Sequence, residues 1–191
     1  MMRQASLQGS SRKTSQLVSR YGTAETFLTT FNPDCQQVVC RSADECFFGD
    51  YPTLTETRIA YGDNVPVAWM IPQLYDLSEY CGCRDKLNGK PLEQCAFVIA
   101  TEFHYLKVTE LMLFFHRFKT GRYGRFYGSV DPLVITTALR EFINERGIAY
   151  EHHEQQERER KEKEDAKRST SWEDFCMREY GEIRPHPLSR L

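Results

Sequence analysis

Hydrophobic positions recur every three or four residues between Leu54 and Ile148, which is the spacing of helices that bury one face. No alternation of hydrophobic and polar residues, the pattern of a strand, runs for a useful length in the chain. The pattern therefore predicts an all-α fold, a small helical bundle of about five helices. The expected helices lie near residues 53–62, 64–81, 91–106, 108–118 and 132–146.

Local signals indicate where two of these helices begin and where one is interrupted. Thr53 and Glu56 have the spacing of a capping box, in which each side chain accepts a hydrogen bond from an unpaired backbone N–H. Asp131 followed by Pro132 is a strong start signal for the last core helix. Pro72 is expected to kink or divide the second helix, because proline removes a donor and clashes with the preceding turn.

The helical repeat also predicts the core. The segment ELMLFFHRF is apolar most of the way round, so it is expected to be the central helix. The predicted inward positions are Val67, Met70 or Ile71, Leu74, Leu77, Leu92, Cys95, Ile99, Phe103, Leu106, Val108, Leu111, Met112, Phe115, Phe118, Ile135, Ala138 or Leu139, and Phe142.

Polar segments flank this apolar middle, so the sequence predicts three parts. Residues 1–50 are expected to be a mostly flexible basic arm with one short helix, since they begin with four cations and no acid before Glu25. Residues 51–150 form the predicted helical core domain. Residues 151–191 are expected to be a charged helical extension that ends in a docking segment, because Glu and Lys or Arg alternate closely there.

Composition excludes several classes of protein. Among 191 residues the charged fraction is 27% and the net charge is −2, which argues against a protein that coats nucleic acid over its whole surface. No run approaches the ~18 consecutive apolar residues of a membrane span, and the N-terminal stretch MMRQASLQGSSRKTSQ lacks the apolar segment of a secretory signal. The sequence therefore predicts a cytoplasmic protein without a membrane partner, whose seven cysteines are reduced thiols.

The stretch HRFKTGRYGRFYGSVDP, residues 116–132, concentrates cations, aromatic rings and glycines between two predicted helices. Cations offer charge to phosphates and aromatic rings offer faces on which bases stack, so this basic aromatic loop is a candidate surface for DNA or RNA. The alternative is structural: the rings close the end of the core and the arginines pair with Glu110, Asp131 or Glu141. The candidate nucleic-acid-binding residues are Arg117, Lys119, Arg122, Tyr123, Arg125, Phe126 and Tyr127.

A second candidate surface lies near the C-terminus, in the segment SWEDFCMREYG. Its hydrophobic side chains are Trp172, Phe175, Met177 and Tyr180, and anchors at about one-turn spacing are typical of a helix that docks in a partner's groove. The same segment could instead fold back onto the chain's own apolar surface. The sequence leaves both alternatives open.

Metal and catalytic motifs give no site. The CGC run at 81–83, with Cys95 and a distant His104, lacks the paired CxxC spacing of a structural zinc site, so no metal and no cofactor are predicted. There is no Walker-type glycine loop, no nucleophile elbow and no HExxH sequence, which favours a non-enzymatic protein without catalytic residues. The acid or base side chains near the apolar core are Glu102, His104, Glu110 and His116.

Two runs, TLTETRIAYGDNVPVAWMIPQLYDLSEYCG and LKVTELMLFFHRFKTGRYGRFYGSVDPLVITTALREF, resemble an uncharacterised helical family of Bacteroidota genomes and their phages or integrative elements. The resemblance covers roughly residues 50–145 and brings no activity, fold or ligand with it. Its mobile-element context raises slightly the expectation of a role around DNA. The leading hypothesis is an accessory protein that binds nucleic acid or a nucleoprotein partner through the basic aromatic loop, and the alternative is a protein–protein adaptor that uses residues 151–191.

Overall fold

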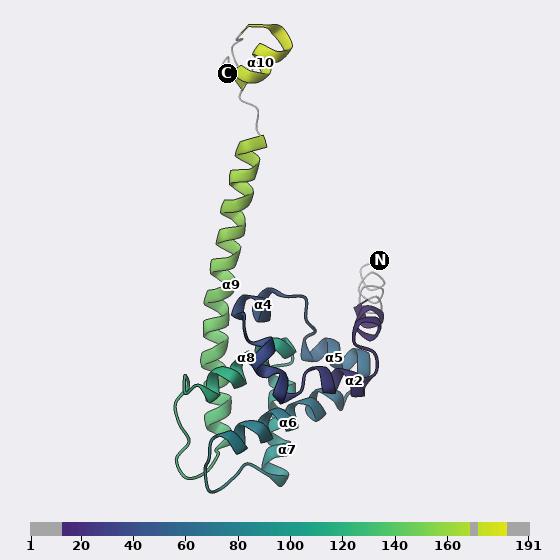
Figure 1. Cartoon of the computed structure of the whole chain (residues 1–191), viewed down its shortest axis with the longest axis vertical. Coiled ribbons are helices and arrows are strands. Elements are labelled where there is room, and N and C mark those ends of the chain that lie inside the picture. Colours follow the sequence, from purple (N-terminus) through teal and green to yellow (C-terminus); the bar gives the residue numbers. More distant parts are fainter. Residues whose placement is uncertain (1–12, 169–171, 183–191) are drawn as a thin grey trace. The chain divides into compact units, whose positions relative to one another are not determined.

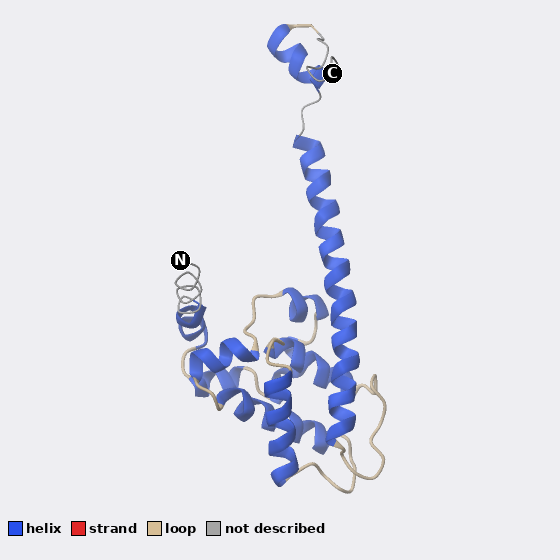
Figure 2. Ribbon diagram, turned by 180° about the vertical axis from the view of Figure 1, so that it is seen from behind, coloured by secondary structure: helices blue, strands red, loops and turns tan. Residues whose placement is uncertain are grey.

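The computed structural model describes residues 13–168 and 172–182, and within these ranges it is all-α (Figure 1; Figure 2). Isolated bridges are the only β pairing among the described residues. Ten helical elements are present there instead of the predicted five, and residues 13–21 are also helical. In chain order they are α2 (Ala24–Thr30), the 3-10 turn η1 (Pro33–Cys35), α3 (Gln36–Val39), α4 (Ala43–Phe48), α5 (Leu54–Tyr61), α6 (Val65–Tyr80), α7 (Gly89–Glu102), α8 (Val108–Lys119), α9 (Pro132–Arg168) and α10 (Trp172–Tyr180).

The five predicted helices correspond to α5 through α9, so their existence and order are confirmed. The signals at their ends are confirmed too: Glu56 completes the capping box with Thr53, and the Asp131 carboxylate accepts a hydrogen bond from the Leu133 N–H at 2.8 Å. Pro72 does not divide α6, which is one helix of 16 residues. A proline within a long helix removes one hydrogen bond, and the packing of α6 against its neighbours offsets that loss.

The chain divides into two compact units, Met1–Arg146 and Gly147–Leu191. We call the first the helical body and the second the C-terminal unit. The division falls inside α9, close to the predicted end of the core domain at residue 150.

The core of the helical body surrounds α8, as the sequence predicts. This helix is buried at every position from Val108 to Phe115 and again at Phe118. The helices α3, α4 and α6 pack against it, and α6 also packs against α7 (Figure 1). Of the predicted inward positions, those on α7, α8 and α9 are all buried, while Val67 and Ile71 on α6 are only half-buried.

The prediction of a mostly flexible arm over residues 1–50 is wrong for residues 13–50. Phe27, Phe31 and Phe47 are fully or almost fully buried in the helical body. The indole N–H of Trp69 donates a hydrogen bond to the Phe31 carbonyl at 2.7 Å, so α6 also holds the segment through its backbone. The helices here have four to seven residues and gain their stability from these tertiary contacts, since helices this short are marginal alone.

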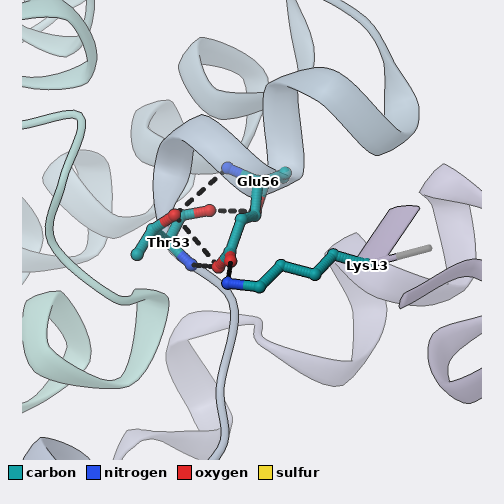
Figure 3. Close-up of polar contacts among 4 residues, drawn as sticks. Lys13, Thr53 and Glu56 are labelled. Carbon is teal, nitrogen blue, oxygen red and sulfur yellow. Dashed lines mark hydrogen bonds and ion pairs between the residues drawn. The ribbon is translucent and has the colours of Figure 1, made fainter. Parts of the chain in front are cut away.

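The cations at the start of the described chain contact carboxylates of the helical body. Lys13 forms an ion pair with Glu56 at 3.1 Å, on the same carboxylate that caps α5 (Figure 3). Arg20 pairs with Asp50 at 3.3 Å and lies over the rings of Tyr21 and Tyr51. Lys13 and Arg20 therefore form surface ion pairs with acids of the helical body; Arg3 and Arg12 lie outside the described residues.

In the C-terminal unit, residues 147–166 of α9 are exposed or half-buried. Charged pairs run along them: Glu154 with Arg158 at 3.8 Å, and Glu157 with Arg160 at 2.8 Å. Pairs at these spacings stabilise a solvated helix by about 0.2–0.5 kcal/mol each. None of the helices in the described ranges is long and apolar enough to cross a membrane.

Candidate functional sites

The cations of the basic aromatic loop bind carboxylates of the protein itself. One carboxylate, Glu145 on α9, accepts from Arg117 Nη1 at 2.9 Å, from Arg122 Nε at 2.9 Å and from the Tyr123 hydroxyl at 3.3 Å. The Arg117 guanidinium also lies over the rings of Phe47 and Phe142. Both arginines are therefore paired inside the helical body, as the structural alternative predicts, although the acid is Glu145 and not Glu110, Asp131 or Glu141.

Lys119, at the end of α8, is fixed by a second polar network. Its ammonium group donates to the Asp76 carboxylate and, at 2.9 Å, to the side-chain oxygen of Gln36. Gln36 is buried and donates in turn to Gln73 at 2.7 Å, and Gln73 donates to the Phe31 carbonyl at 2.9 Å. The Lys119 side chain is only 16% exposed, so its ammonium group is not free to bind a phosphate.

Two of the three aromatic rings in the loop pack on the core. The Tyr123 ring lies 5.5 Å from that of Phe114, and the Phe126 ring stacks on that of Phe118 at 5.1 Å with an angle of 15°. Two backbone hydrogen bonds with Asp85 also hold the end of the loop. The Asp85 N–H donates to the Gly128 carbonyl at 3.2 Å, and the Val130 N–H donates to the Asp85 carbonyl at 3.0 Å. The loop closes one end of the core.

Only part of the predicted nucleic-acid surface faces solvent. Tyr127 is 88% exposed, and Arg125 is exposed without a hydrogen bond or ion pair to any described residue. Arg122 is half-exposed but paired with Glu145. The prediction that all seven residues form one outward surface is wrong, because Arg117, Lys119 and Tyr123 contact other parts of the body and Phe126 is half-buried against Phe118.

The contacts of Tyr123 lead to a testable alkaline titration. Burial, with the nearby Glu145 charge, raises the pKa of Tyr123 to about 12. The folded protein then holds this proton while the unfolded chain loses it near pH 10, so this residue's contribution to stability falls between about pH 10 and 12. Difference absorbance spectra of the protein and of Tyr123→Phe should assign the late titration to this residue. A phenol that titrates near pH 10 would contradict the packing described above.

Tyr80 and Lys119 are shared by two adjoining hollows on the helical body, which we call the Lys119 groove. The larger hollow has a volume of about 380 Å³ and a polar lining that includes Asp76, His116 and Thr120. The smaller has a volume of about 220 Å³ and is lined by Phe118, Phe126 and Arg125, with Gly121 and Gly124. No local pattern in the sequence indicates this groove, since its residues come from η1, α3, α6, α8 and the loop.

Two cysteines that the sequence analysis did not single out contact each other. Interaction with the Cys46 thiol, together with burial, raises the pKa of Cys40, whereas interaction with Cys40 lowers the pKa of Cys46 against the effect of burial. The Cys46 thiol also lies 3.3 Å from the Val39 carbonyl. All seven cysteines are free, and the described residues contain no cluster of side chains that could hold a metal ion.

The predicted docking segment is the helix α10. Met177 and Tyr180 are 53% and 51% exposed, and they lie three residues apart on one side of the helix. The Phe175 ring is half-buried and contacts that of Tyr180 at 6.2 Å. The side chain of Trp172 lies outside the described part of the structure.

Comparison with protein families gives one match. Residues 90–184 match the model of a family of unknown function, DUF6633. The DUF6633 match covers just under half of the chain, from the start of α7 through the basic aromatic loop and α9 to the end of α10. It agrees with the expectation of an uncharacterised family, while the Bacteroidota and phage context stays a prediction. The searches of curated proteins and of solved structures found no match.

Proposed function

We propose that the protein is a non-enzymatic adaptor that engages a protein partner through α10. Residues 151–166 of α9 support this proposal, because most of them are charged and all are exposed except the half-buried His153 and Glu157. A helix that is polar all round is typical of a solvated connection between separate modules. Along the chain this helix joins the helical body to α10, and residues 147–168 span about 33 Å at 1.5 Å per residue.

The surface of α10 indicates the chemistry of the partner. Met177 and Tyr180 supply exposed apolar area, and their spacing fits a helix that lies in an apolar groove. The nine residues of α10 contain three acids and one arginine, so lysine or arginine at the rim of the groove would complement them. The DUF6633 match includes both the charged helix and α10, which supports a shared role for the two.

The full-length protein and two matched variants, Met177→Gln and Arg178→Gln, test this proposal. The residues are neighbours on α10 and both are exposed, so neither change should disturb the helix. If Met177 is an anchor worth about 2 kcal/mol, Met177→Gln should weaken partner binding about 30-fold, whereas Arg178→Gln should not.

Proteins that co-purify with the full-length chain from its native cells, quantified by mass spectrometry, give the measurement. A partner retained equally by the parent and by Met177→Gln would contradict docking through α10.

The leading hypothesis from the sequence, nucleic-acid binding through the whole basic aromatic loop, is not carried into this proposal. Arg117 and Arg122 share Glu145, and Lys119 is held by Asp76, so three of the four cations already contact a carboxylate of the protein. The association of a phosphate with either arginine would compete with these carboxylate contacts.

A further inference from the structure

The Lys119 groove has the size and the division of polar and apolar surface expected of a small-ligand site. Its larger hollow, at about 380 Å³, falls within the ~300–1,000 Å³ of typical ligand pockets. The smaller hollow adjoins it at Tyr80 and Lys119. Polar and apolar groups line both hollows, so the groove suits a ligand that has a polar part and a flat apolar part.

The polar end is held together by hydrogen bonds within the protein. Lys119 is held by Asp76 and by Gln36, and Gln36 is 2% exposed and bound to Gln73. Lys119 and Asp76 compensate each other, and Asp34 and His116 also line this end, so it presents a mixture of donors and acceptors. The edge of a nucleobase offers the same mixture of donors and acceptors.

Flat rings and a free cation line the other part of the groove. The Tyr80 ring is 63% exposed, with the Lys119 ammonium 5.7 Å from its centre, and the half-buried Phe126 ring is held parallel to that of Phe118. The Arg125 guanidinium borders these rings without a carboxylate partner among the described residues. Rings of this kind stack on planar bases, and a free guanidinium binds phosphate oxygens.

We propose that the Lys119 groove binds one nucleotide unit, with its base against Tyr80 or Phe126 and its phosphate at Arg125. In this proposal Arg125 and Phe126 keep the roles predicted from the sequence. Lys119 orients the polar end and does not bind the phosphate, and Tyr80 was not among the predicted binding residues. The unit is either a free nucleoside monophosphate or the 5′-phosphorylated end of a single strand. The site is independent of α10 and of the adaptor function.

Calorimetric titration of the full-length protein tests the site with four probes: a nucleoside monophosphate, the same nucleoside without phosphate, inorganic phosphate, and a short 5′-phosphorylated oligonucleotide. Tyr80→Leu should weaken the nucleoside and the monophosphate alike by about 5- to 150-fold, the equivalent of a stacking contribution of about 1–3 kcal/mol. Arg125→Ala should weaken the monophosphate by about 10-fold and leave the nucleoside unchanged.

Matched controls exist elsewhere on the helical body. Tyr75→Leu removes a tyrosine from the same helix α6, and Arg84→Ala removes an exposed arginine; both residues lie outside the groove lining. Neither control should change binding. Equal affinity for the monophosphate and the oligonucleotide would identify a free nucleotide as the ligand, and a tenfold preference for the oligonucleotide would identify a strand end. Absence of saturable binding by all four probes, or binding that Tyr80→Leu and Arg125→Ala leave intact, would overturn the proposal.

Discussion

Replacing Arg146 by methionine should lower the free energy of unfolding by about 3–5 kcal/mol, because it removes the cation that pairs with the buried carboxylate of Glu110. Glu110 on α8 is completely buried, and its side chain accepts from Arg146 Nε at 2.7 Å and from the backbone N–H of Lys107 at 2.9 Å. Methionine keeps much of the aliphatic volume of arginine but leaves the negative charge of Glu110 in the core without this cation. Urea unfolding followed by circular dichroism measures the loss.

Two further variants separate charge from packing in this experiment. Arg140→Met makes the same change on the same helix, at an exposed position, and should shift stability by less than about 0.5 kcal/mol. Adding Glu110→Gln to Arg146→Met removes the buried charge, so the double variant should recover part of the loss. Equal destabilisation by Arg140→Met and Arg146→Met would show that the buried ion pair does not stabilise the fold.

Replacing Trp69 by alanine should cost about 3–5 kcal/mol as well, through a cavity in the core. The Trp69 side chain is 1% exposed, and its indole N–H reaches the Phe31 carbonyl in the segment that the sequence suggested was flexible. Loss of the ring should therefore loosen residues 24–48 together with α6. Relative to the parent protein, the variant should show a larger increase in amide hydrogen exchange in α2 than in α7. Its midpoint of unfolding should also be lower.

Trp69→Phe is the matched control, because it keeps an aromatic ring and removes the N–H donor. Gln73 still donates to the Phe31 carbonyl at 2.9 Å, so this carbonyl is not left without a partner. The loss should be about 1 kcal/mol, typical of one hydrogen bond. If Trp69→Ala left exchange in α2 unchanged, the N-terminal helices would not depend on this anchor.

The parts of the fold that could be predicted are those encoded by neighbours in sequence. The buried positions of α7, α8 and α9 follow the helical repeat, and the Thr53–Glu56 capping box is a contact over three residues. Residues 24–48 carry no such repeat, because their helices are too short to show a period. Phe27, Phe31 and Phe47 are isolated hydrophobic residues whose burial depends on tertiary contacts.

The same distinction applies to the candidate sites. The sequence identified the cations of the loop correctly but not the acids that bind them, since Arg117 and Glu145 are 28 residues apart and Lys119 and Asp76 are 43 apart. A basic motif looks free whenever its carboxylate lies on another element. The Lys119 groove could not be found for this reason either, as Gln36 and Lys119 are separated by 83 residues.

Because Glu145 pairs with both Arg117 and Arg122, one substitution at this position would change the charge of the whole loop. A change to glutamine there would unmask two guanidinium groups and relax the hold on Tyr123 at once, adding positive potential beside Arg125. Relatives that lack an acid at this place would then carry a stronger electropositive patch than this chain does, so a lineage could gain or lose affinity for polyanions without altering its scaffold.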